Sequence, residues 1–345
     1  MQFHDFPFFS SFLSLRYRSH INQIAQEAKV SKSTVSRYLN EGYVSKETAE
    51  KIEKVIQKYN YTPNEFARNL KAQRSNFTGV IIPRLDSPSV VRMLSGLEKS
   101  ERECGRQIMM VNSELNIERE IESLYNLQQN KIAAIVLMAV AITDEHIKAI
   151  NKIKTPVLVL GQKDRRLITL TQDNYFAGRQ MALGLKKYGH KKIAYVGVGT
   201  HDIEVGIRRK QGVIDGLKES GVSTVKEYET TFMVNDAYKL GLEILPKNDE
   251  TLYICATDNI AIGLIKAANQ LGITIGKQIS IAGFGGHDTG EYVYPTLTTV
   301  DLHHEKLGIL ASKYVDIMLK KQPIPETTTI ATEMIHRGSV GYYHE

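Results

Sequence analysis

The side chains best suited to chemistry lie near the start of the chain, where hydrogen-bonding groups fall on one face of a helical pattern. Residues 21–40 have the sequence INQIAQEAKVSKSTVSRYLN. In the second half of this segment Val35, Tyr38 and Leu39 share an apolar face. The opposite face carries Ser33, Ser36, Arg37 and Asn40, with Lys32 at its N-terminal end. A helix that is apolar on one side and rich in donors on the other can lie in the major groove of DNA and contact base edges.

The residue types on this face suggest two kinds of DNA contact. Arg37 can donate two hydrogen bonds to O6 and N7 of a guanine, which is worth about 1–3 kcal/mol of discrimination. We expect Thr34, Ser36 and Asn40 to contact phosphates, which fixes register without reading sequence. Capping or packing is the alternative for each serine and threonine. An ordinary helical hairpin with a solvated face is the alternative for the whole segment.

Two further helices are needed to hold this face in place. An apolar stripe at helical spacing predicts a first helix, with Ile21, Ile24, Ala25 and Ala28 on its buried face. A tight turn follows at Val30, and Ser31 can cap the second helix through its hydroxyl. A third helix is expected after the N-cap Ser45, with Glu47 in its first turn. Its predicted buried face consists of Ala49, Ile52, Ile56 and Tyr59. Together the three helices predict a helix-turn-helix DNA-binding domain over residues 20–62.

Charge is distributed unevenly along the 345 residues. Residues 1–75 hold 12 lysines and arginines against 7 acidic residues, whereas the rest of the chain holds 32 against 31. Most of the formal net charge of +6 therefore lies in the segment with the helical pattern, which suits a small nucleic-acid-binding domain on a nearly neutral body. Cys104 and Cys255 are far apart in sequence, so we expect two reduced thiols of a cytoplasmic protein and no disulfide framework or zinc site.

The first 18 residues are crowded with Phe and Ser. A secretory signal would place basic residues before its apolar stretch, but Arg16 and Arg18 come after it. We therefore interpret residues 1–18 as a disordered extension or a misassigned start. No apolar run is long enough to span a bilayer, so no membrane partner is expected.

From Thr78 onward, short apolar strands alternate with amphipathic helices. Strands are expected at 79–83, 107–111, 133–138, 156–160, 192–197, 251–256 and 279–284, and helices at about 88–104, 117–129, 174–188, 205–220, 235–245 and 257–271. This alternation predicts an α/β fold with right-handed crossovers. Because there are too many units for one small sheet, we expect two doubly wound parallel-sheet subdomains that flank a cleft. Ligands of such sheets bind beyond the carboxyl ends of the strands.

The sequence contains none of the common catalytic motifs. Gly197 and Gly199 follow a predicted strand but lack the third glycine of a dinucleotide-binding loop. No P-loop, HExxH or GxSxG sequence occurs, and the adjacent His303 and His304 point apart on a helix. We therefore expect no catalytic residue, no metal site and no cofactor.

Over nearly all of residues 20–340 the chain resembles the lactose/galactose repressor (LacI/GalR) family. The resemblance is carried by VSKSTVSRYLN (30–40), NYTPNEFARNL (60–70), ISIAGF (279–284) and PTLTTV (295–300). Within that family the chain is most similar to the sucrose-operon repressors, with the trehalose-operon repressors next. The segments that indicate this are IIPRLDSPSV (81–90), GQKDRRL (161–167), IEVGIRRKQGVIDGL (203–217) and CATDNIAIG (255–263).

The resemblance implies a body like that of the periplasmic sugar-binding proteins, working as a homodimer on operator DNA. It places a hinge helix and linker at residues 63–76 and an effector-binding and dimerisation domain at 77–345. The N-subdomain would comprise about 77–173 with 301–330, and the C-subdomain about 174–300 with 331–341.

The resemblance also implies further DNA contacts. Lys32 and Ser33 match family positions that vary with the operator sequence. Leu70 matches the hinge leucine, and two such leucines from a dimer would wedge into the minor groove and kink the duplex. Arg68 and Lys71 would meet the phosphates beside it.

The first expected effector contact follows the first strand of the body. Arg84 and Asp86 lie there, with Ser87 and Pro88 opening the next helix. A guanidinium beside a helix N-terminus suits a phosphate or an acidic group. Trehalose-type repressors, which have a similar RLDS segment, use this arginine for the phosphate of a sugar phosphate, so we favour a phosphorylated sugar. A surface ion pair between Arg84 and Asp86 is the alternative.

Four other positions match the family's effector cleft. Arg209 matches an arginine that hydrogen-bonds sugar hydroxyls in relatives, and Thr257 stands where a sugar-contacting asparagine is common. Asp173 and Asp258 match cleft-facing positions, although a capping or core role is open for both.

One segment departs from the family pattern. Relatives often carry an aspartate after the strand at 279–284, whereas this chain has Gly-Gly-His-Asp at 285–288. Effector contacts at this edge therefore cannot be transferred, and His287 is a weaker candidate.

The sequence thus predicts a transcriptional repressor of a sucrose-type sugar operon, which a small sugar or sugar phosphate releases from its operator. A trehalose-type regulator, or a catabolite-control regulator with a protein effector, is the first alternative. A sugar-binding transport protein would need a signal peptide and no helix-turn-helix, and an α/β enzyme would need a catalytic motif. We expect a two-state dimer in which the effector changes the angle between the subdomains and separates the hinges.

Overall fold

The computed structural model describes residues 21–39, 42–59, 61, 75–247 and 249–343. They belong to two compact units, Met1–Ser75 and Asn76–Glu345, and each is described by itself. The predicted extension at 1–18, Asn40, and the hinge residues Arg68, Leu70 and Lys71 lie outside the described residues.

The first unit packs three short helices around a small apolar core. Residues 21–27 are helical, α2 spans Lys32–Leu39 and α3 spans Lys46–Lys58. The core side chains are Ile24, Ala25, Ala28, Val35, Ile52 and Val55. Both predicted N-caps are confirmed. The Oγ of Ser31 accepts from the Thr34 N–H at 3.1 Å, and the Oγ of Ser45 accepts from the Thr48 N–H.

The predicted burial of Tyr59 is wrong. Tyr59 is the C-cap of α3 and is 36% exposed, and its hydroxyl donates to Glu27. Val55 lies three residues after Ile52, on the same face of the helix, and takes the buried position instead.

The second unit begins with a six-stranded parallel sheet whose order is β11-β5-β4-β3-β1-β2. Its strands are β1 (Phe77–Ile82), β2 (Gln107–Asn112), β3 (Ala134–Leu137), β4 (Val157–Leu160), β5 (Thr169–Gln172) and β11 (Thr327–Ile330). The helices that cover it are α5 (Pro88–Glu103), α6 (Ile117–Gln129), α7 (Asp144–Lys152) and α13 (His304–Leu319). One apolar core joins the sheet to α5 and α13, and a second joins it to α6 and α7. We call this half the N-subdomain.

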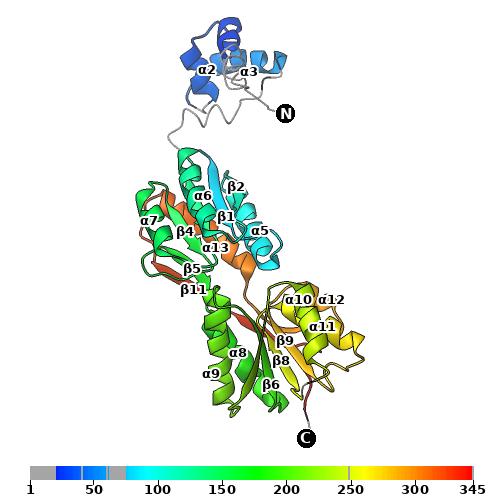
Figure 1. The fold of residues 1–345 in the computed structure, drawn as a ribbon. Helices are drawn as coiled ribbons and strands as arrows, with labels where there is room; N and C mark the ends of the chain where they lie inside the picture. The colour runs from blue at the N-terminus through cyan, green and yellow to red at the C-terminus, as the bar shows by residue number, and fades with distance from the viewer. Residues whose placement is uncertain (1–20, 40–41, 60, 62–74, 248, 344–345) are drawn as a thin grey trace, which may run out of the picture. The chain divides into compact units, whose positions relative to one another are not determined.

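The other half, the C-subdomain, is a six-stranded sheet in the order β12-β10-β9-β8-β6-β7. Its strands are β6 (Ile193–Val198), β7 (Val225–Thr230), β8 (Leu252–Cys255), β9 (Ser280–Gly285), β10 (Thr298–Asp301) and the antiparallel β12 (Glu333–Ile335). Its helices are α8 (Asn174–Leu185), η1 (Lys186–Tyr188), η2 (Ile203–Arg209), α9 (Lys210–Glu219), α10 (Val234–Ile244), α11 (Asp258–Gln270) and α12 (Thr289–Tyr292). Helices α8 and α9 lie on one side of the sheet, and α10 and α11 on the other (Figure 1).

The chain passes between the two subdomains at residues 172–174, 301–304 and 330–333. Helix α13 therefore packs on the N-subdomain although the strand before it, β10, belongs to the C-subdomain. It also packs closely on α5. The approach is so close that a Cβ added at Gly308 of α13 would lie 2.0 Å from the carbonyl oxygen of Met93. This contact fixes the crossover at 301–304 relative to α5.

The seven predicted strands are confirmed, with bounds that differ by at most two residues. The predicted helices at 88–104, 117–129, 235–245 and 257–271 match α5, α6, α10 and α11 equally well. The predicted helix at 174–188 covers α8 and η1, and the one at 205–220 covers most of η2 and all of α9. The apolar-run pattern missed β5, β7, β10, β11, β12, α7, α12 and α13. Strand β7 is an edge strand with the sequence VKEYET, and β11 is a threonine-rich edge strand, so neither has the apolar run of a central strand. None of the described helices is long and apolar enough to cross a membrane.

Candidate nucleic-acid interface and ligand cavity

Helix α2 presents the predicted DNA-reading face. Lys32, Ser33 and Arg37 are exposed, whereas Val35 is fully buried. The Tyr38 hydroxyl donates to Glu53 of α3 at 2.5 Å, which holds α2 against its neighbour. The first unit therefore presents a cationic helix face on a packed support.

Two of the small polar side chains on α2 are already engaged at the N-cap. The Oγ of Ser31 lies 2.7 Å from Ser33 Oγ and 2.8 Å from Thr34 Oγ1. Because a hydroxyl can both donate and accept, each can still meet a phosphate or a base while it keeps this contact. Ser36 is half-buried on the same helix.

The body contains a large cavity with walls from both subdomains. Its volume is about 1060 Å³, just above the range of about 300–1,000 Å³ that is usual for small-molecule sites. The residues after strand ends that line it include Arg84, Ala139, Gln162, Gly199, Phe232, Thr257 and His287. The cavity therefore lies where ligands of doubly wound sheets bind, beyond the carboxyl ends of the strands.

Arg209 lies at the end of a π-helix, η2, and lines this cavity. Its side chain is almost completely buried, and burial lowers the pKa of the guanidinium below its ordinary value. Its Nη1 donates to the Ala256 carbonyl at 2.6 Å, and its Nε and Nη2 donate to Asn174 Oδ1 at 3.1 and 2.6 Å. The ring of Phe284 lies 5.2 Å from the guanidinium carbon. π-Helical turns are frequent at functional sites, and this one holds a fixed cation in the cavity wall.

Two acidic residues of the same segment also line the cavity. Asp202 caps η2 by accepting from the Val205 N–H at 3.0 Å, and Glu204 accepts from Asn174 Nδ2 at 3.1 Å. Burial raises the pKa of both carboxyls above their ordinary values. The cavity wall therefore places the acceptor oxygens of Asp202 and Glu204 beside the N–H donors of Arg209.

Arg84 lines the cavity at its N-subdomain side and reaches across it. Its Nε lies 3.3 Å from Asp86 Oδ1, so the ion pair considered as an alternative is present, although Asp86 is largely exposed. The Arg84 guanidinium carbon also lies 5.2 Å from the ring of Phe232, and Nη1 lies 3.9 Å from the sulfur of Met233. These two residues belong to the C-subdomain.

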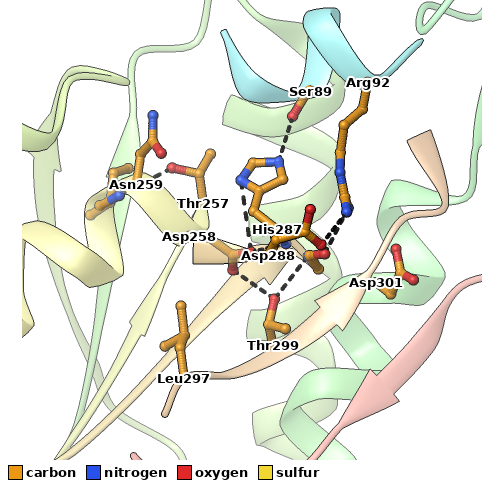
Figure 2. A network of polar contacts seen from close by, with 12 residues as sticks. Ser89, Arg92, Thr257, Asp258, Asn259, His287, Asp288, Leu297, Thr299 and Asp301 are labelled. Carbon is orange, nitrogen blue, oxygen red and sulfur yellow. Dashed lines mark hydrogen bonds and ion pairs between the residues drawn. The ribbon is translucent and has the colours of Figure 1, made fainter. Parts of the chain in front are cut away.

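Thr257 and Asp258 have different surroundings. Thr257 lines the cavity and caps α11 by accepting from the Ile260 N–H. Asp258 is fully buried and is not among the lining residues. Its carboxylate accepts from Thr299 Oγ1 at 2.6 Å and from the His287 N–H at 2.9 Å (Figure 2). The structure thus gives Asp258 the core surroundings that the sequence left open.

Asp173 is exposed and is the N-cap of α8, where it accepts from the Phe176 N–H at 2.9 Å. Its neighbours Gln172 and Asn174 line the cavity, whereas Asp173 does not. His287 does line the cavity, and its Nε2 lies 3.2 Å from Ser89 Oγ.

Several cavity residues were missed at the sequence level: Gln162, Asn174, Asp202, Glu204, Phe232 and His304. The position of Gln162 and Asn174 next to the ends of β4 and β5 is the signal that could have found two of them. Asp202 and Glu204 lie in the segment that was already singled out for Arg209.

Comparisons with known proteins agree with this architecture. The family model described as bacterial regulatory proteins, lacI family, matches residues 20–64, and one described as periplasmic binding protein-like domain matches residues 184–340. A sucrose operon repressor from Staphylococcus xylosus is 35% identical over 91% of this chain and 98% of its own length. Catabolite control protein A from the same organism is 29% identical over 92% of this chain and 98% of its own length.

The fold also matches a solved structure. The crystal structure of the Lac repressor dimer bound to operator and the anti-inducer ONPF aligns with a TM-score of 0.85 and 20% identity, covering 92% of this chain and 97% of that one. A helix-turn-helix unit joined to a body of two doubly wound subdomains around a cavity defines a DNA-binding regulator with a ligand-binding body. The chain belongs to the LacI family and is a DNA-binding transcriptional repressor. The predicted fold class and family are confirmed.

Proposed function

We propose that this repressor controls an operon for sucrose utilisation and that a sugar bound in the cavity releases it from its operator. The assignment to a sucrose operon is supported by the 35% identity to the S. xylosus sucrose operon repressor. The observation that best supports a sugar as the ligand is the position of Arg209, a buried cation in the wall of a cavity that both subdomains form.

The polar groups around Arg209 suit sugar hydroxyls. Three of the five guanidinium N–H groups donate to Asn174 and Ala256, so two face no acceptor among the described residues. Each sugar hydroxyl both donates and accepts, and the carboxyls of Asp202 and Glu204 supply acceptors beside these donors. The ring of Phe284 supplies an apolar surface for the C–H face of a sugar.

A phosphorylated sugar is the finer proposal. Arg84 stands beside the start of α5, whose cap is Ser87 and whose first residue is Pro88. A phosphate there would meet the guanidinium and the positive end of the helix dipole. It would also compete with Asp86, whose exposed carboxylate can leave the ion pair at little cost.

On the DNA side, we propose the contacts that the sequence indicates. Lys32, Ser33 and Arg37 would face bases, with Thr34, Ser36 and Asn40 on phosphates, and Arg68, Leu70 and Lys71 would act at the hinge. The cavity residues Arg84, Asp86, Thr257, Arg209 and His287 would contact the effector, whereas Asp173 and Asp258 would support the site from outside the wall. The repressor would act as a homodimer in the cytoplasm, where its operator is. We also propose that residues 20–62, 63–76 and 77–345 are the head, the hinge and the effector-binding body.

A thermal-shift screen of the full-length protein tests the effector. Sucrose, sucrose 6-phosphate, trehalose 6-phosphate and fructose are added at increasing concentration, because a ligand that binds only the folded protein raises its Tm with concentration. We expect sucrose 6-phosphate to raise the Tm most. A larger rise with trehalose 6-phosphate would replace the sucrose assignment. No rise with any of the four would refute a sugar of this group and favour a protein effector.

A further inference from the structure

The last residue of β9 and the three residues after it, 285–288, form a loop that lies against the crossover that leads into α13. Gly286 has a φ of +65°, which glycine adopts without strain. A Cβ at this position would lie 2.7 Å from the Cα of Asp301, the last residue of β10. The loop therefore lies where the C-subdomain passes into the N-subdomain.

Arg92 on α5 reaches this loop from the other subdomain. Its Nη1 donates to the Gly286 carbonyl at 2.8 Å, and its Nη2 lies 2.5 Å from Asp288 Oδ1 (Figure 2). Helix α5 packs on the first sheet, whereas the loop continues a strand of the second. One guanidinium thus joins the two subdomains through two atoms of one short loop.

His287 lies between the two residues that Arg92 holds. Its backbone N–H donates to the buried Asp258, and its Nε2 contacts Ser89 Oγ at 3.2 Å. Ser89 precedes Arg92 by three residues and lies on the same face of α5. The ring of His287 is 5% exposed and lines the ligand cavity, whereas Arg92 is not among the lining residues.

We propose that Arg92 is a positioning residue, which holds the 285–288 loop against α5 and keeps His287 in the wall of the effector cavity. This inference rests on the proposed function, because it concerns the affinity of the same cavity. A ligand that contacts His287 binds more tightly when the loop that carries this side chain is already held in place. Loss of Arg92 therefore weakens effector binding although no ligand-contacting group is removed.

The two contacts of Arg92 differ in strength and in sensitivity to salt. Asp288 has a side chain that is 77% exposed, so water and salt screen its ion pair with Arg92. The bond to the Gly286 carbonyl is charge-assisted and partly buried, so it is stronger and less sensitive to salt. The carbonyl bond is the contact that holds the loop.

Isothermal titration of full-length variants with sucrose and with sucrose 6-phosphate tests this role. Arg92→Met keeps the apolar stem of the side chain and removes the guanidinium, and we expect a Kd about tenfold higher. The loss should persist at 0.5 M KCl. Arg92→Lys, which keeps one donor group, should recover part of the affinity, whereas Asp288→Asn should change the Kd less than about twofold.

Arg102→Met is the matched control. Arg102 lies on the same helix and is 70% exposed, and its ion pair among the described residues is with Glu98 of α5, so its removal should leave the Kd unchanged. If Arg92→Met binds the sugar as tightly as the wild type does, or if Asp288→Asn loses as much affinity as Arg92→Met, the proposal is overturned.

Amide hydrogen exchange gives a second readout that needs no ligand. The His287 N–H donates to Asp258, so it should exchange faster in Arg92→Met, while amides in the core of the N-subdomain keep their rates. Equal exchange at His287 in both proteins would overturn the proposal. A wild type that binds neither sugar, with faster exchange in the variant, would refute the effector assignment and leave the role of Arg92 in holding the loop intact.

Discussion

Arg209 directs two of its N–H groups at a single oxygen of Asn174, with Nε at 3.1 Å and Nη2 at 2.6 Å from Oδ1. Asn174 is the last residue of the crossover at 172–174 and the first residue of α8, whereas Arg209 ends η2. The amide Nδ2 of Asn174 donates in turn to Glu204. One amide therefore fixes both a buried cation and a buried carboxyl in the cavity wall.

Replacing this amide should weaken both folding and sugar binding. In Asn174→Ala, the buried N–H groups of Arg209 lose their acceptor, which should lower the free energy of unfolding by about 1–3 kcal/mol. We expect the affinity for the sugar to fall at least about tenfold, because Arg209 is no longer held in place. Urea denaturation and isothermal titration measure the two effects. Asn235→Ala, an exposed change on α10, is the control, and an unchanged sugar affinity in Asn174→Ala would contradict this role.

Arg84 should distinguish a phosphorylated from an unphosphorylated sugar. Arg84→Met removes the guanidinium and keeps a stem that can cover Phe232, so we expect the affinity for sucrose 6-phosphate to fall at least about tenfold. The affinity for sucrose should change much less. Arg165→Met, an exposed change in the same subdomain, serves as the control in the titrations. An equal loss for both sugars would mean that Arg84 acts by bridging the subdomains and not by binding phosphate.

Stability should depend on pH through His304. Burial, with the neighbouring His287 and Arg209, holds the pKa of His304 well below its ordinary 6.5. The unfolded chain takes up a proton at His304 near pH 6.5 and the folded protein does not, so stability falls as the pH drops below that value. The contribution is at most about 1.4 kcal/mol per pH unit.

Urea unfolding between pH 7.5 and 5.5 measures this dependence. His304→Gln should show a shallower loss of stability than the wild type over the same range. The carboxyls of Asp202 and Glu204 have raised pKa values and act with the opposite sign, but they are present in both proteins. Identical slopes would show that His304 does not contribute.

The α5–α13 contact should not tolerate a methyl group. Gly308→Ala would place a Cβ 2.0 Å from the Met93 carbonyl oxygen, so the helices must move apart. Overpacking of this kind costs about 1–3 kcal/mol, and we expect the urea midpoint to fall accordingly. Lys306→Ala, on the exposed face of the same helix, should leave the midpoint nearly unchanged. Equal midpoints for Gly308→Ala and the wild type would contradict the close packing.

The fold could be predicted where the sequence has strong local patterns. Central strands such as β8 and β9 are apolar runs and were predicted, whereas β7 at the sheet edge alternates charged and half-buried residues and was not. Capping was also predictable, because Ser31, Ser45 and Ser87 accept from N–H groups only three residues away.

The site was only partly predictable, because long-range contacts decide which side chains face the cavity. Asp173 and Asn174 are adjacent in sequence but have different surroundings. Asp173 caps α8 and is turned to solvent, whereas Asn174 accepts a hydrogen bond from Arg209, which lies 35 residues further along the chain. Asp258, at the start of α11, hydrogen-bonds to Thr299 on β10, which lies 41 residues further along the chain. No local pattern in the sequence specifies either pairing.

The most direct test of the account is the release of operator DNA by sugar. Fluorescence anisotropy of labelled promoter fragments from the protein's own genomic neighbourhood is measured at low salt, because phosphate contacts weaken as salt rises. Arg209→Lys, which keeps a charge but not the planar donor geometry, is compared with the wild type. We predict that both proteins bind the same fragment and that sucrose 6-phosphate or sucrose releases only the wild type. If the wild type binds no fragment, or if the sugar releases both proteins equally, the account is contradicted.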